Sequence, residues 1–111
     1  MPIHADDLRV LHRFIGGVMD RPAASKVQGI ALALLGGIVW RGQPGTIEVK
    51  DLTGSADSVL WVAIGGKRYA FTYNRQTLEI ELRDRTQTGP ALHRFTNATP
   101  VGEVEAIFRH L

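Results

Sequence analysis

Hydrophobic residues recur at helical spacing near the start of the chain. Their intervals of three and four residues predict an amphipathic helix. Its apolar stripe is Leu8, Leu11, Phe14, Ile15, Val18 and Met19. Asp6 or Asp7 is placed to cap the start of this helix, because a carboxylate accepts unpaired backbone N–H groups. Pro22 predicts where the helix ends.

The next segment is apolar on nearly every side. Gln28 is the only polar side chain in the 14 residues from Val27 to Trp40. This run is too short to span a bilayer and predicts a buried helix over residues 23–35. Gly36-Gly37 is expected to end that helix, because glycine adopts the left-handed cap conformation at little cost. Residues 38–40 are then expected to form a short strand.

From residue 46 onward, polar and apolar residues alternate with a period of two, which predicts half-buried strands. The expected strands cover residues 46–50, 58–64, 67–74, 77–84 and 91–96. Gly65-Gly66 fits a tight hairpin turn, and Arg75-Gln76 occupies the position of the next one.

These two turns set a register for the hairpins. The first turn places Val62 opposite Tyr69, and the second places Tyr73 opposite Leu78 and Glu81 beside Ala70. A slip by one residue would scatter the apolar residues over both faces of the sheet. One face therefore collects Leu60, Val62, Ile64, Tyr69, Phe71, Tyr73, Leu78, Ile80 and Leu82.

A last helix is predicted at the end of the sequence. Thr99 is placed to cap it, and Pro100 suits the first helical position. Its apolar stripe is Val101, Val104, Ile107, Phe108 and Leu111. We therefore expect a single α+β domain over residues 1–111, in two layers. An antiparallel meander of four to five strands would carry two N-terminal helices and one C-terminal helix on one face.

Composition narrows the classes of function. Thirteen basic and eleven acidic residues give a net charge of only +2, whereas a dedicated nucleic-acid binder carries a denser basic patch. The absence of cysteine excludes disulfides and thiolate metal sites. The acidic start of the chain is unlike a signal peptide, so we expect a cytoplasmic protein with no membrane partner. The excess of arginine over lysine suits a small bacterial protein.

Local catalytic signatures are missing from the sequence. It holds no phosphate-binding loop, no dinucleotide fingerprint and no metalloprotease or serine-hydrolase motif. Its histidines are not at metal-ligand spacing, so no metal and no cofactor is predicted. These histidines are His4, His12, His93 and His110. Whether the chain is an enzyme stays open, because many active sites have no local motif.

The face of the sheet opposite the apolar set combines a tryptophan with small and charged residues. We name it the Trp61 face, and it comprises Val59, Trp61, Ala63, Arg68, Ala70, Thr72, Glu81 and Arg83. An apolar centre with tryptophan and arginine is typical of an interface. Another subunit, a ligand, or the chain's own Trp40 and residues 91–96 would cover it. The leading hypothesis is a non-enzymatic protein-interaction module that forms a homodimer through this face.

Two alternatives come from other classes. The first is a small-molecule-binding protein or small enzyme with a pocket between helices and sheet, where Tyr69, Tyr73, Glu79, Glu81 and His93 supply polar groups. The second is weak nucleic-acid binding through the arginines. Residues 67–71 partly resemble the RNP1 motif of RNA-recognition domains, which exposes its aromatic residues. The register here places these aromatic residues in the core, so this alternative ranks last.

Overall fold

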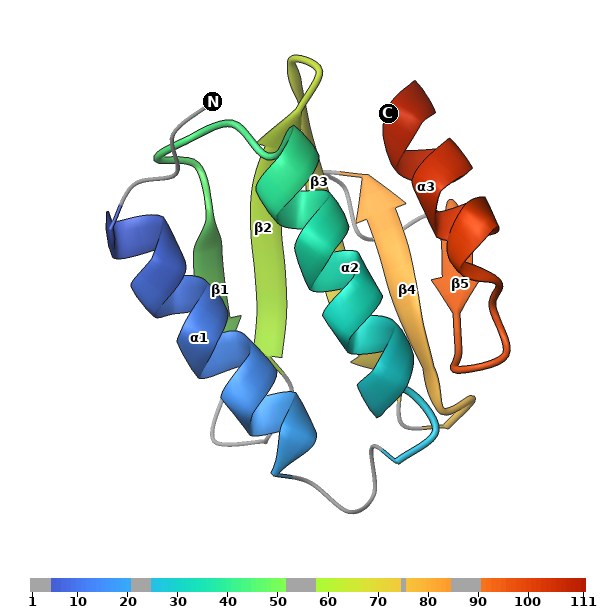
Figure 1. The fold of residues 1–111 in the computed structure, drawn as a ribbon. Helices are drawn as coiled ribbons and strands as arrows, with labels where there is room; N and C mark the ends of the chain where they lie inside the picture. The colour runs from blue at the N-terminus through green and yellow to red at the C-terminus, as the bar shows by residue number, and fades with distance from the viewer. Residues whose placement is uncertain (1–4, 21–24, 52–57, 75, 85–90) are drawn as a thin grey trace.

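The structure is a computed structural model, and it describes residues 5–20, 25–51, 58–74, 76–84 and 91–111. Five strands form one antiparallel sheet in the order β1-β2-β3-β4-β5, and the three helices lie on one of its faces (Figure 1). The elements are α1 (Ala5–Met19), α2 (Gln28–Arg41), β1 (Glu48–Asp51), β2 (Ser58–Ile64), β3 (Lys67–Asn74), β4 (Glu79–Asp84), β5 (His93–Phe95) and α3 (Val101–His110). The predicted two-layer α+β meander is confirmed.

The register of the first hairpin matches the prediction, and that of the second does not. Val62 pairs with Tyr69 as expected. Tyr73 pairs with Ile80 instead of Leu78, so the predicted two-residue turn at 75–76 is wrong, although Arg75 itself lies outside the described residues. The turn is longer because the Asn74 side chain accepts hydrogen bonds from the following backbone N–H groups of residues 76 and 77. A shift of two residues keeps every side chain on its predicted face.

Helix α2 runs through the glycine pair at which it was expected to end. It begins at Gln28 and ends at Arg41, so the prediction of a helix over 23–35 and a strand over 38–40 is wrong. Gly37 lies against the ring of Phe108, where an added Cβ would come within 2.6 Å of ring carbons. This close helix–helix packing outweighs the helical penalty of about 1 kcal/mol for each glycine. Gly42 is the C-cap of this helix, and its N–H donates to the Ile38 carbonyl.

The residues predicted as helix caps make other contacts. Asp7 lies inside the first turn of α1, and its Oδ2 accepts a hydrogen bond of 2.8 Å from the N–H of Gly45. Thr99 does not cap α3, because its Oγ1 accepts from the N–H of Thr96. The α2 N-terminus instead receives Asn97, whose Oδ1 accepts a 3.0 Å hydrogen bond from the Ile30 N–H.

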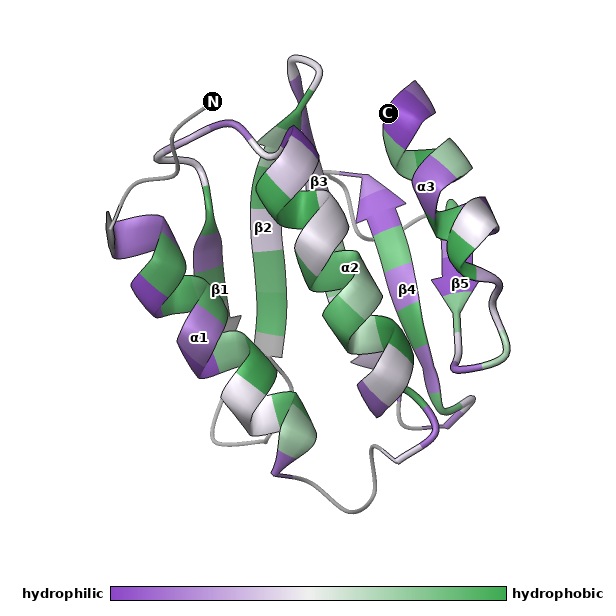
Figure 2. Cartoon of the chain, in the orientation of Figure 1, coloured by the Kyte–Doolittle hydropathy of each residue, from purple (hydrophilic) through white to green (hydrophobic). Residues whose placement is uncertain are grey.

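The core lies between the sheet and the helices. Its largest fully buried side chains include Phe71, Phe95 and Phe108, and the rings of Phe71 and Phe108 stack with centroids 5.9 Å apart. Helix α2 is the most uniformly hydrophobic of the three helices (Figure 2). Among the described residues, no helix is both long and apolar enough to cross a membrane.

Candidate functional site

The structure brings the predicted site residues together on one face of the sheet, the face opposite the helices. Cross-strand pairing sets Val59 opposite Thr72 and Trp61 opposite Ala70. The corrected register sets Glu81 opposite Thr72 and not beside Ala70. All eight members of the Trp61 face, including Ala63, Arg68 and Arg83, therefore share this side of β2, β3 and β4.

Arg68 lies over the Trp61 ring. Its guanidinium carbon is 4.9 Å from the ring centroid, within the range of a cation–π contact. Its Nη2 also donates a 3.1 Å hydrogen bond to the Glu48 carboxylate on β1. Both partners of this ion pair remain well exposed, so its contribution to stability is small. The result is an aromatic and guanidinium platform that is ordered and still accessible.

The apolar part of the Trp61 face is smaller than its sequence indicates. Val59 and Ala70 are only 3% and 0% exposed. Trp61, Ala63 and Thr72 are partly exposed and form the accessible part of the face. Trp40 does not cover this face, because it is on α2 in the helical layer. Residues 93–95 extend the sheet as strand β5, from which Arg94 reaches Glu81.

Glu81 is the buried charge of this face. Its side chain is 3% exposed, and its Oε1 accepts hydrogen bonds of 3.1 Å and 2.8 Å from Arg83 Nε and Nη2. Its Oε2 accepts a 3.2 Å bond from Asn74 Nδ2 and lies 3.6 Å from Arg94 Nε. Burial alone would raise the pKa of Glu81, but these bonds and the charges of the two arginines outweigh burial and lower it. Glu81 is therefore held as a carboxylate.

The residues of the alternative pocket are not brought together. Tyr69 is 6% exposed in the core, and Tyr73 is half-buried against the same core. Glu79 pairs with Asn74 on the opposite face of the sheet. His93 does line a cavity of about 290 Å³ between β5 and α3, together with Glu103, Ala106, Ile107, His110 and Leu111.

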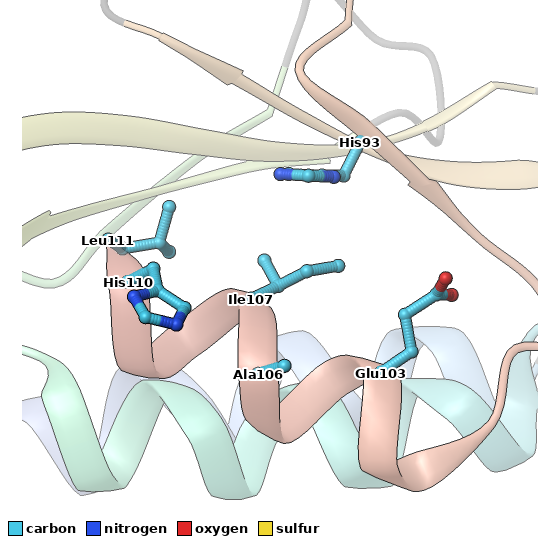
Figure 3. Close-up of a pocket in the computed structure, with 6 residues that line it drawn as sticks. All are labelled: His93, Glu103, Ala106, Ile107, His110 and Leu111. Carbon is cyan, nitrogen blue, oxygen red and sulfur yellow. The ribbon is translucent and has the colours of Figure 1, made fainter.

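This edge pocket has an apolar wall and a few polar groups. Glu103 and Ile107 rise from α3 toward His93 on β5 (Figure 3). Across the described part of the chain, no three histidine and carboxylate side chains are grouped so as to hold a metal ion. The pocket therefore offers hydrogen bonds and apolar contact to a small organic ligand.

A third surface was missed by the sequence analysis. Four large apolar side chains are exposed on the outer side of the helical layer, namely Leu32 (52%), Val39 (46%), Trp40 (47%) and Val101 (71%). With the groove of about 190 Å³ between α2 and α3, they form what we name the α2–α3 surface. The signal was present in the sequence: a helix that is apolar all round has a second apolar side that the sheet cannot cover.

The guanidinium groups of Arg41 and Arg109 flank Trp40 on this surface. They lie 6.0 Å and 5.3 Å from its ring centroid. Arg109 is also 3.7 Å from Glu105, one turn earlier on α3. The α2–α3 surface thus has an apolar centre and a charged rim, the arrangement typical of protein interfaces.

Comparison with known proteins places the chain in a family. Residues 11–105 match the model of the family described as integron cassette protein VCH_CASS1 chain, and the chain belongs to that family. No protein in the curated collection matches the chain. The match spans α1 to the first half of α3 and thus includes the sheet and both of its faces.

Proposed function

We propose that this member of the integron cassette family is a non-enzymatic bacterial protein-interaction module that binds a protein partner on its Trp61 face. The observation that carries the proposal is the stacked pair of Trp61 and Arg68, partly exposed on a sheet face that no described helix covers. Tryptophan and arginine are the residues most enriched among those that dominate binding energy at interfaces. The cytoplasm, predicted from the sequence, is the proposed setting.

The charges around Trp61 define the chemistry of the partner. Arg68, Arg83 and Arg94 supply three guanidiniums, and Glu48, Glu79 and Glu81 supply three carboxylates. The face therefore carries charges of both signs in equal number. It fits a polypeptide segment in which an apolar or aromatic side chain meets Trp61 and neighbouring carboxylates meet the guanidiniums.

The state of Glu81 argues against acid–base catalysis on this face. A general acid or base works best when its pKa lies near the operating pH. The pKa of Glu81 is lowered by its bonds to Arg83 and Asn74, which moves it away from neutrality. Nucleic-acid binding is also disfavoured, because the net charge of the chain is only +2 and contacts to many phosphates require a denser basic patch.

Peptide selection tests the proposal. Phage-displayed random peptides are selected on the wild-type protein, and their affinities are measured by fluorescence polarisation. We expect peptides that combine an aromatic residue with Asp or Glu. Trp61→Ala should weaken binding by roughly tenfold or more, as for an interface hot spot. Trp40→Ala, on the opposite layer, is the matched control and should leave binding unchanged. Peptides that bind the Trp61→Ala variant as tightly as the wild type would overturn the proposal.

The edge pocket supports a second candidate, binding of a small organic molecule. The side chains of Glu103 and His93 line this pocket together with the apolar side chain of Ile107. A fragment screen observed by NMR is the test. Fragments that shift the His93 and Glu103 resonances, and that no longer do so after His93→Ala, would support this function. Shifts that persist in His93→Ala would exclude it.

A further inference from the structure

We propose that a second copy of this chain docks on the α2–α3 surface, so that the protein is a twofold dimer through its helical layer. The inference goes beyond the proposed function and does not depend on it. It also leaves the Trp61 face accessible in the dimer, because that face lies on the other side of the sheet.

The first argument is the composition of α2. Its inner side packs on the core through Ile30, Ala31, Leu34 and Ile38. Its outer side presents Leu32, Val39 and Trp40, each about half exposed, and no charged residue occurs before Arg41. A solvent-facing helix side is ordinarily polar.

The other two helices have mixed outer sides and serve as an internal comparison. Helix α1 exposes Leu8 and Met19 together with Arg9, His12 and Arg13, and α3 exposes Val101 together with Glu105 and Arg109. Only on α2, among the three described helices, do the exposed apolar side chains stand without a charged residue before the last position. A helix that is hydrophobic all round is a buried helix. In this chain the sheet buries one of its sides, and a partner is needed for the other.

The second argument is shape. The groove between α2 and α3 is lined by small residues of α2 that include Ala33 and Gly36, and by the larger side chains of Trp40 and Val101. A Cβ placed on Gly36 would have no neighbour within 4 Å, so the space above it is open. The same surface thus carries projecting side chains and a recess that can receive them. A twofold interface requires this self-complementarity, because one patch meets its own copy.

The third argument is charge. The rim carries guanidiniums from Arg41 and Arg109 and a carboxylate from Glu105. Because both signs border one apolar patch, a twofold arrangement can set the arginines of one copy against the glutamate of the other. A strongly acidic or strongly basic partner would meet like charge at part of this rim. A second copy is therefore the occupant that this rim fits best.

The fourth argument is area. The exposed fractions of Leu32, Val39, Trp40 and Val101 amount to roughly 300 Å² of apolar surface, taking about 250 Å² for Trp and about 100 Å² for each aliphatic side chain. A stable interface of standard size buries about 800 Å² on each partner, with an apolar centre inside a polar rim. The four side chains can supply that centre, and the outer sides of α2 and α3 can supply the rim.

Sedimentation velocity on the full chain tests the proposal, over about three decades of protein concentration. We expect a dimer for the wild type. Gly36→Glu places a charge in the groove without a clash in its own chain, and Val39→Lys places one on the exposed side of α2. Each should raise the dimer dissociation constant by at least about a hundredfold, because an unpaired charge resists burial. Gly16→Glu in α1 is the matched control, since its added Cβ also meets nothing within 4 Å.

The outcomes separate this interface from the others. Circular dichroism and thermal melting check that each variant is folded. Two independent variants are used so that the test still stands if one of them does not fold. A monomeric wild type at every concentration would overturn the proposal, as would folded Gly36→Glu and Val39→Lys proteins that dimerise normally. Loss of the dimer in Trp61→Arg alone would also overturn it, because the second copy would then occupy the Trp61 face. Loss of the dimer in Gly36→Glu and Val39→Lys, with the dimer retained in Gly16→Glu and Trp61→Arg, supports the proposal.

Discussion

Replacement of Glu81 by glutamine is the sharpest test of the structure of the Trp61 face. Glutamine keeps the size of the side chain and removes its charge. In the wild type, Glu81 is 3% exposed and accepts hydrogen bonds from Arg83 and Asn74, with Arg94 within ion-pair distance. The substitution removes the charge that Arg83, whose side chain is only 20% exposed, pairs with at 2.8 Å.

The magnitude follows from these contacts. Hydrogen bonds to a charged group contribute about 1.5–3 kcal/mol each, and breaking a buried ion pair costs about 3–5 kcal/mol. Two effects reduce the destabilisation caused by Glu81→Gln. Water can solvate Arg94, which is 54% exposed, and glutamine still accepts one hydrogen bond. We expect Glu81→Gln to lower the free energy of unfolding by about 2–4 kcal/mol near neutral pH. Glu48→Gln, in the exposed pair with Arg68, should cost less than about 1 kcal/mol.

The pH dependence gives a second readout. The pKa of Glu81 lies below its ordinary value of 4.5 in the folded protein, so its carboxylate stabilises the fold at every pH above that value. This contribution is lost as the pH falls through the lowered pKa. Urea unfolding of the wild type and of Glu81→Gln should therefore show a large difference in the free energy of unfolding at about pH 7. The difference should be smaller at about pH 3. A Glu81→Gln protein as stable as the wild type at neutral pH would refute the reasoning.

Three further substitutions probe how the helices pack, each measured by urea unfolding at one fixed protein concentration. Gly37→Ala should destabilise the protein by about 1–3 kcal/mol, because the new Cβ would clash with the Phe108 ring; a neutral effect would contradict the packing. Gly36→Ala, measured at a concentration where the chain is monomeric, should stabilise it by up to about 1 kcal/mol, because no atom of the same chain lies near the new Cβ and alanine favours the helix; a loss would contradict the open site within the chain. Asn97→Ala should cost about 1–2 kcal/mol, because the Ile30 N–H loses its acceptor. Asn97→Asp keeps an acceptor and should cost less, and equal losses would argue against this contact.

The sheet could be predicted from the sequence because its signals are local. Alternation with a period of two assigns each residue to a face, and a glycine pair at positive φ fixes the first hairpin. The second turn was wrong by two residues, since the chain makes a wider turn in which Leu78 has a φ of 60°. The faces nevertheless stayed correct, because an even shift preserves the alternation. The residues of the Trp61 face could therefore be predicted even though the pairing of Glu81 could not.

The contacts between distant segments could not be predicted, because local pattern does not encode them. Asn97 lies 67 positions from Ile30, and Asp7 lies 38 from Gly45. The sequence predicted a local role for Asp7, as a helix cap, and no role for Asn97. A single sequence shows only how a side chain can interact with its neighbours along the chain. Gly37 shows the same limit. Its sequence context is typical of a helix end, and only the Phe108 ring across the helix interface explains why the helix continues.

The α2–α3 surface shows why an apolar run does not by itself identify what buries it. The hydrophobic effect requires that the outer side of α2 leave water, and it does not specify the covering atoms. The prediction of a buried helix was correct for Ile30 and Leu34, which face the core, but Leu32 in the same predicted helix remains about half exposed within one chain. The proposed dimer interface would remove this discrepancy between pattern and burial. Trp61 differs from these residues, because Arg68 of the same chain stacks on its ring and the pair remains partly exposed.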